Sequence, residues 1–287
     1  MATTTSTLAP SPSSADAPVF RKGAGRWIRE HLVTFFGILV LIYLFIPIFV
    51  VILFSFNKPT GRFNYTWVQF SLDAWKNPCR VAGMCDSLVL SLKIGLIATL
   101  VATILGTVAA FALARHYFRG RAGANLLIFL PMATPEVVAG SSLLTLFINI
   151  GIPLGQLTIL IAHIAFCISF VIVTVKARLS GMDPALEQAA QDLYANRNQV
   201  FLKITLPLVA PGIVAAALLS FSLSFDDFII TNFNSGSAVT FPMFVWGAYQ
   251  RALPPQVNVI GTLMLVVTLV LVGLARLISR RRTGSAS

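Results

Sequence analysis

Six stretches of apolar residues, separated by polar and charged segments, dominate the pattern of the chain. They cover residues 33–56, 94–114, 124–150, 157–175, 208–225 and 257–275. A helix that crosses a bilayer needs about 20 mainly apolar residues, which is close to the length of each stretch. None of them shows the alternation of polar and apolar positions typical of a membrane β-barrel. The pattern predicts an all-α membrane protein with six transmembrane helices.

Composition and charge support this class and suggest an orientation. Hydrophobic residues make up 56% of the chain and charged residues only 11%, with a mean hydropathy of +0.83. A soluble domain carries about 25% charged residues. Fifteen Lys and Arg residues lie in the two tails and in the loops after the second and fourth stretches, against six on the opposite side. Because basic residues gather on the cytoplasmic side, we expect both termini there, and the net charge of +11 needs no nucleic acid partner.

This topology divides the chain into three parts. Residues 1–30, rich in Ala, Ser, Thr and Pro near the start, are expected to be a disordered cytoplasmic tail. Residues 31–278 form the membrane domain, with a polar cytoplasmic loop at 177–206, and residues 279–287 form a short tail. The first apolar stretch is too long for a secretory signal, so we expect it to stay as a spanning helix.

The three cysteines and three histidines suggest one disulfide and no metal site. Cys79 and Cys85 lie six residues apart in an external segment, where they can pair or stay as free thiols; pairing is favoured in an oxidising compartment. Cys167 falls inside the fourth stretch and is expected to be an inert packing residue. His163 falls there too, and a hydrogen bond between helices is favoured over a ligand role.

The cytoplasmic loop predicts two short helices. Asp183 followed by Pro184 is a helix start, and Leu186, Ala189, Ala190 and Leu193 share one face at helical spacing. Asn196 is a candidate N-cap for a second helix through residue 203. Such a pair forms either a docking surface or an ordinary amphipathic hairpin at the membrane.

This loop resembles a cytoplasmic signature in the permease subunits of ATP-binding-cassette importers. The signature is Glu-Ala-Ala, three residues, Gly, nine residues and Ile-x-Leu-Pro. Here the same spacing joins Gln188-Ala189-Ala190, Tyr194 and Ile204-Thr205-Leu206-Pro207. Gln188 replaces the Glu, although Glu187 precedes it, and Tyr194 replaces the Gly. The segments at 130–144 and 224–233 are also similar to these permeases, the second to spermidine/putrescine permeases, so the resemblance covers roughly residues 30–280.

The resemblance implies the type I importer fold, the bacterial cytoplasmic membrane and a division of labour between subunits. A homodimer of ATPases would bind ATP and Mg²⁺, a second related permease would complete a heterodimer, and an external binding protein would deliver the solute. This chain has no G-x-x-x-x-G-K-[ST] motif, so we expect it to be a transport subunit without a cofactor and not an enzyme. The docking loop would contact the ATPase through Glu187, Gln188, Ala189, Ala190, Leu193 and Tyr194.

Acidic residues within the spans are the candidate substrate path. A charge at the bilayer centre costs about 2.5–3.5 kcal/mol on insertion scales, so it is a functional candidate by default. Glu136 follows Pro131 and Pro135 near the middle of the third span, where the prolines should break the helix. Asp226 and Asp227 lie at the outer mouth of the fifth span, and adjacent residues on a helix cannot face one direction.

The aromatic residues near these acids favour a cationic substrate. Phe225 and Phe228 lie beside the Asp pair, and Phe221 precedes them at helical spacing. A carboxylate with aromatic rings suits an organic polycation through ion pairing and cation–π contact, although plain packing also explains a Phe stripe. The sequence therefore predicts a polyamine importer subunit. The alternatives are an importer permease for another solute and an ion-coupled secondary transporter.

Overall fold

The protein is described from a computed structural model, which covers residues 24–283; residues 1–23 and 284–287 lie outside the described part. The chain divides into two units, one ending at Leu53 and the other beginning at Phe54. Within the first unit, helix α1 (Ala24–Phe54) begins inside the segment expected to be a tail. Its described side chains are exposed up to Val50, and nearly all of those beyond Thr34 are apolar. A helix that is hydrophobic all round belongs in a membrane.

The core of the second unit is a bundle of three long helices, α3 (Met84–Arg115), α6 (Gln156–Ser180) and α9 (Leu206–Asp226). Each packs against the other two, with buried residues such as Ala102, Val171 and Ala216 between them. Gly106 shows how close the backbones come, because a Cβ atom there would lie 2.7 Å from the Cβ of Val171. Small residues at such contacts let membrane helices approach each other.

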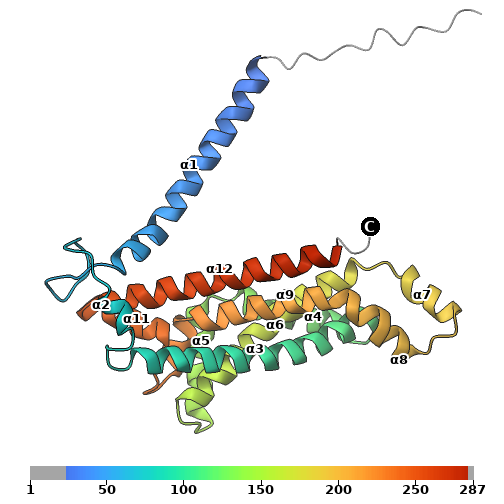
Figure 1. The fold of residues 1–287 in the computed structure, drawn as a ribbon. Coiled ribbons are helices and arrows are strands. Elements are labelled where there is room, and N and C mark those ends of the chain that lie inside the picture. Colours follow the sequence, from blue (N-terminus) through green and yellow to red (C-terminus); the bar gives the residue numbers. More distant parts are fainter. Residues whose placement is uncertain (1–23, 284–287) are drawn as a thin grey trace, which may run out of the picture. The chain divides into compact units, whose positions relative to one another are not determined.

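The two ends of this bundle carry different elements (Figure 1). Helices α7 (Ala185–Asp192) and α8 (Arg197–Val200) lie at one end, which we call the loop end. Helices α2 (Asp73–Lys76) and α11 (Phe241–Arg251) lie at the opposite end, which we call the far end. Because α3 and α6 finish at the loop end and α9 starts there, the last residue of α9 reaches the far end.

The third apolar stretch is broken in two. Helices α4 (Arg121–Ala133) and α5 (Glu136–Asn149) meet at an angle of 107°. Pro135 precedes the first residue of α5 and cannot donate a backbone hydrogen bond, while Thr134 still donates its N–H and its hydroxyl to the Leu130 carbonyl. The break expected before Glu136 is therefore present between Ala133 and Glu136, whereas Pro131 lies inside α4 and does not end it.

The number of helices able to cross a membrane is lower than six in the described residues. Four are long and apolar enough, or five when α4 and α5 count as one broken span. The remaining candidate, α12 (Pro255–Thr283), contributes a shorter apolar stretch over Pro255–Val270. The class of all-helical membrane protein is confirmed by this arrangement.

The far end is held by local cross-links. Cys79 and Cys85 form a disulfide with Cα atoms 5.5 Å apart, between α2 and the start of α3. Asn57 donates to the side-chain oxygen of Asn64 over 2.7 Å, and Asn64 donates to the Phe54 carbonyl over 2.8 Å. These contacts give the segment between α1 and α2 a fixed conformation.

The loop end contains both short helices that the sequence predicts. Asp183 accepts a hydrogen bond from the Ala185 N–H over 2.9 Å at the start of α7. Asn196 caps α8, with reciprocal bonds between its side chain and the Gln199 N–H and between the Gln199 side chain and the Asn196 N–H. The second helix does not run on regularly to residue 203, because it passes into a π-helical turn, η1 (Phe201–Thr205), before α9.

Candidate functional site

The adjacent residues Asp226 and Asp227 have different environments at the far end. Asp226 is the last residue of α9 and is exposed, whereas Asp227 leaves the helix with an extended backbone, φ −62° and ψ 123°. The two side chains diverge as expected, but the cause is the end of α9 and not the spacing of a continuous helix. The predicted Phe stripe is interrupted at the same point, because Phe228 precedes α10 (Ile229–Asn234) and lies outside α9.

Asp227 is buried and contacts both α6 and α10. Its side chain is 5% exposed and accepts hydrogen bonds from the Thr231 N–H and hydroxyl, both over 2.8 Å, which caps the start of α10. Nε2 of His163 on α6 lies 3.2 Å from the same carboxylate, and Nδ1 of His163 lies 2.7 Å from the Ser224 hydroxyl on α9. His163 thus has the inter-helix contacts expected for a packing residue. Asp227 joins α6 to the turn between α9 and α10.

Asp226 instead borders a hollow of about 600 Å³, which we call the aromatic hollow. Five of its lining residues are aromatic: Phe225, Phe228, Phe241, Trp246 and Tyr249. The ring centroids of Phe228 and Trp246 are 5.5 Å apart, and those of Trp246 and Tyr249 are 6.4 Å apart. One carboxylate lies among rings that keep much of their surface free, since Trp246 is 53% exposed and Tyr249 is 57% exposed.

This combination suits an organic cation. An ammonium group gains about 0.5–2 kcal/mol over an aromatic face, more when water is excluded, and the carboxylate adds an ion pair. A flexible polycation can place one amine near Asp226 and its methylene segments against the rings. The chemistry available here is binding and release, because the lining residues contain no nucleophile paired with a base.

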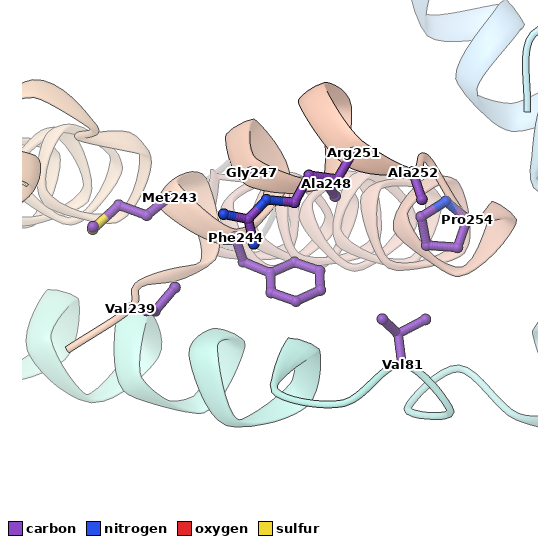
Figure 2. A pocket seen from close by; sticks show the side chains of 9 residues that line it. All are labelled: Val81, Val239, Met243, Phe244, Gly247, Ala248, Arg251, Ala252 and Pro254. Atoms are coloured by element: carbon purple, nitrogen blue, oxygen red, sulfur yellow. The ribbon is translucent and has the colours of Figure 1, made fainter. Parts of the chain in front are cut away.

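A second hollow of about 460 Å³ on another face of α11 has the opposite preference (Figure 2). It lies between α11 and Val81 of the segment closed by the disulfide, and its lining is apolar apart from Arg251. In Figure 2 the Arg251 side chain extends back along α11. A fixed positive charge repels a cation, so this second hollow does not fit the substrate class that the aromatic hollow fits.

Glu136 is not brought into the aromatic hollow. It is the first residue of α5, directly after the bend, and its side chain is exposed. No residue of α5 lines the aromatic hollow. In the isolated chain, Glu136 and Asp226 are therefore separate candidates, and the structure groups only Asp226, Phe225 and Phe228 of the predicted path residues.

The residues of α11 were missed by the sequence analysis. Phe241, Trp246 and Tyr249 supply one wall of the aromatic hollow, and they lie outside the six apolar stretches. The sequence feature that could have indicated this wall is the high aromatic content of the segment FPMFVWGAY, which precedes the last apolar stretch. Aromatic residues at this depth are common in the interface belt, which explains why the density alone did not indicate a site.

The loop end presents a second candidate surface. Leu193 and Tyr194 are 81% and 97% exposed, and Tyr194 has a positive φ of 61° at the position where the permease signature has Gly. Ala190, in contrast, is buried within the chain at 9% exposure. The predicted apolar face of Leu186, Ala189, Ala190 and Leu193 is therefore split, since α7 ends at Asp192 and Ala190 turns inward.

Similarity to known proteins identifies the class of protein to which this chain belongs. Residues 102–284 match the family described as the binding-protein-dependent transport system inner membrane component. The chain belongs to this family, so it is a multi-pass permease of the plasma membrane, a transport component and not an enzyme. The fold agrees: the chain is similar to a bacterial ABC transporter that imports the acidic polysaccharide alginate, with a TM-score of 0.62, 17% identity, and coverage of 91% of this chain and 98% of that chain.

Two relatives are similar to nearly the whole chain. The spermidine/putrescine transport system permease protein PotC of Haemophilus influenzae is 37% identical over 254 residues, which are 88% of this chain and 98% of the relative. The putrescine transport system permease protein PotI of Escherichia coli K12 is 38% identical over 231 residues, which are 78% of this chain and 82% of the relative. The resemblance found in the loop and span motifs is therefore confirmed.

Proposed function

We propose that this chain is the permease subunit of an ATP-driven importer that moves polyamines, such as spermidine and putrescine, into the cytoplasm. The similarity to PotC and PotI supports the substrate class. The observation that carries the proposal is Asp226 at the mouth of α9, beside five aromatic rings. An amine-rich, flexible and mostly aliphatic solute uses both parts of that lining.

The proposed topology has six passes, with both termini in the cytoplasm of a bacterial cell. In this topology α1, α3, the broken pair α4–α5, α6, α9 and α12 each cross once. The excess of Lys and Arg at the tails and near the loop end supports this orientation. The far end, with the disulfide and the aromatic hollow, would then face outward, where an oxidising compartment favours the disulfide.

The proposed assembly contains a homodimer of ATPases, a second related permease and an external binding protein. A periplasmic protein is bound to the alginate transporter in a second solved structure, which is similar to this chain with a TM-score of 0.66 and 17% identity. The exposed residues Leu193 and Tyr194 would contact an ATPase, which would hold ATP and Mg²⁺, and the chain itself would need no cofactor. Glu136, exposed at the bend, would face the path between the two permeases.

Uptake of radiolabelled putrescine and spermidine by the complete assembly in proteoliposomes tests the proposal. We expect wild-type uptake that requires ATP and the binding protein. Asp226→Asn should reduce uptake at low polyamine concentration, because the ion pair is lost and the size is kept. Asp73→Asn removes an equal charge from an exposed position on α2, outside the lining of the aromatic hollow, and should leave uptake unchanged. ATP-dependent uptake of a different solute, with no polyamine uptake, would favour the alternative of another importer specificity.

A further inference from the structure

Glu187 connects the docking loop to two spanning helices. It lies in the first turn of α7, and its side chain is only 16% exposed, although the neighbouring Leu186 is exposed. One carboxylate oxygen, Oε1, accepts hydrogen bonds from two donors. They are Nη2 of Arg115 and, over 2.6 Å, the hydroxyl of Thr205.

The two donors belong to different helices of the bundle. Arg115 is the last residue of α3, and Thr205 is the last residue of η1, directly before α9. A second contact joins the same elements, because the rings of Phe111 and Phe201 lie 5.3 Å apart, edge to face. Both ends of the π-helical turn are therefore fastened, one to α3 and one to α7. We call Arg115, Glu187 and Thr205 the carboxylate joint.

The helices joined in this way also carry the two walls of the aromatic hollow. Asp226 and Phe225 form the end of α9, about 30 Å along the helix from Thr205 at 1.5 Å per residue. On the other wall, α11 is held on α3, because the Phe241 N–H donates to the Ser91 hydroxyl over 2.8 Å in a buried contact. A movement of α7 that shifts α3 against α9 would therefore change the spacing of the walls.

We propose that Glu187 is a positioning residue that transmits movement of the docking loop to the aromatic hollow through Arg115 and Thr205. This inference builds on the proposed function, in which an ATPase moves that loop. Packed helices pass a displacement along their length because close-packed interiors deform little. The π-helical turn supports the assignment, since such turns are frequent at functional sites.

A structural role of Glu187 and a role in transmitting movement predict different effects of its substitution on ATP hydrolysis and uptake. If Glu187 only stabilises the loop, its loss lowers assembly, ATP hydrolysis and uptake together. If it transmits movement, ATP hydrolysis continues while less solute moves for each ATP hydrolysed. The ratio of solute moved to ATP hydrolysed in the purified assembly therefore separates the two.

Thr205→Val is the sharpest variant because it keeps the shape of the side chain and removes only the hydroxyl that reaches Glu187. Glu187→Gln keeps an acceptor for Thr205 and removes the ion pair with Arg115. We expect both to lower the transport ratio by about threefold to tenfold, which is typical of altered coupling between sites. Thr268→Val is the matched control, because its exposed hydroxyl donates to the Met264 carbonyl of its own helix, α12, and its loss should leave the ratio unchanged. An unaltered ratio, or a parallel fall of hydrolysis and uptake in both variants, would overturn the proposal.

A second measurement does not depend on the identity of the solute. Spin labels at Ser222→Cys on α9 and Gln250→Cys on α11 report the distance between the two walls, in a background with Cys167→Ser and the native disulfide intact. We expect ATP to shift the distance distribution in the wild type and not in Thr205→Val. An equal shift in both would reject the joint. The wild-type assembly could move no polyamine while the ATP-dependent change in distance still requires Thr205. That result would reject polyamines as the substrate and support the role of the carboxylate joint.

Discussion

Nε2 of His163 and a carboxylate oxygen of Asp227 lie 3.2 Å apart, and their side chains are only 3% and 5% exposed. The contact explains why two adjacent acids of one sequence motif have different environments. His163 holds Asp227 inside the bundle, and Asp226 remains at the hollow.

The first prediction separates stability from transport at this pair. Asp227→Asn should lower the free energy of unfolding by about 1–3 kcal/mol, because one amide cannot replace an acceptor that takes bonds from Thr231 and contacts His163. Asp226→Asn should leave stability unchanged and weaken uptake. Thermal unfolding in detergent followed by size-exclusion chromatography measures the first effect. Equal stability of the two variants would contradict the division.

The second prediction concerns the rings of α11. Trp246→Leu keeps an apolar side chain and removes the aromatic face, so the loss of about 0.5–2 kcal/mol should raise the polyamine concentration for half-maximal uptake about two- to thirtyfold. Phe244→Leu alters the second hollow instead and is the matched control. An equal change in both variants would show that packing, and not cation binding, is measured.

The third prediction concerns the sidedness of the membrane. A membrane-impermeant thiol reagent, applied to intact cells after mild reduction, should label Cys79 and Cys85, because the far end is proposed to face outward. Cys167 is fully buried in α6 and should stay unlabelled. Labelling that requires cell lysis would reverse the proposed orientation.

The fourth prediction concerns Tyr194 at the exposed tip of the docking loop. A non-glycine residue in the left-handed region costs about 1–2 kcal/mol, so Tyr194→Gly should relieve strain while Tyr194→Ala keeps most of it. Since the ring is 97% exposed, we expect it to bind the ATPase, and both variants should reduce co-purification of the ATPase. If Tyr194→Gly binds normally and only Tyr194→Ala is weakened, the turn geometry and not the ring is what matters.

The local parts of the structure were predictable from the sequence. The apolar stretches, the break before Glu136 and the Asn196 cap each depend on a few neighbouring residues whose geometry is fixed by the backbone. The divergence of Asp226 and Asp227 was also expected, although it arises because α9 ends between them and not from the 100° between neighbours on a helix. The sequence pattern could not assign which acid is buried, because that depends on His163, which lies more than sixty residues away in sequence.

The features that could not be predicted depend on contacts between elements that are far apart in the sequence. Ala190 carries the same helical spacing as Leu193, yet only the packing of α7 shows that one is buried and the other exposed. Glu187 was identified beside a motif position, but its link to Arg115 joins residues 72 positions apart. The wall formed by α11 required knowledge of its contact with α3, for which periodicity gives no signal.

The bend between α4 and α5 also has a consequence for how the protein is made. Helices of 13 and 14 residues are each shorter than the roughly 20 needed to cross the hydrocarbon core. Neither half alone is long enough to span that core, so we expect both to be synthesised before either partitions into lipid. Because α4 packs against α6 and α5 packs against α10, release into lipid should wait for these two helices, which arrive later in synthesis. The order of translation, and not hydrophobicity alone, would then decide when the α4–α5 pair becomes a stable part of the membrane domain.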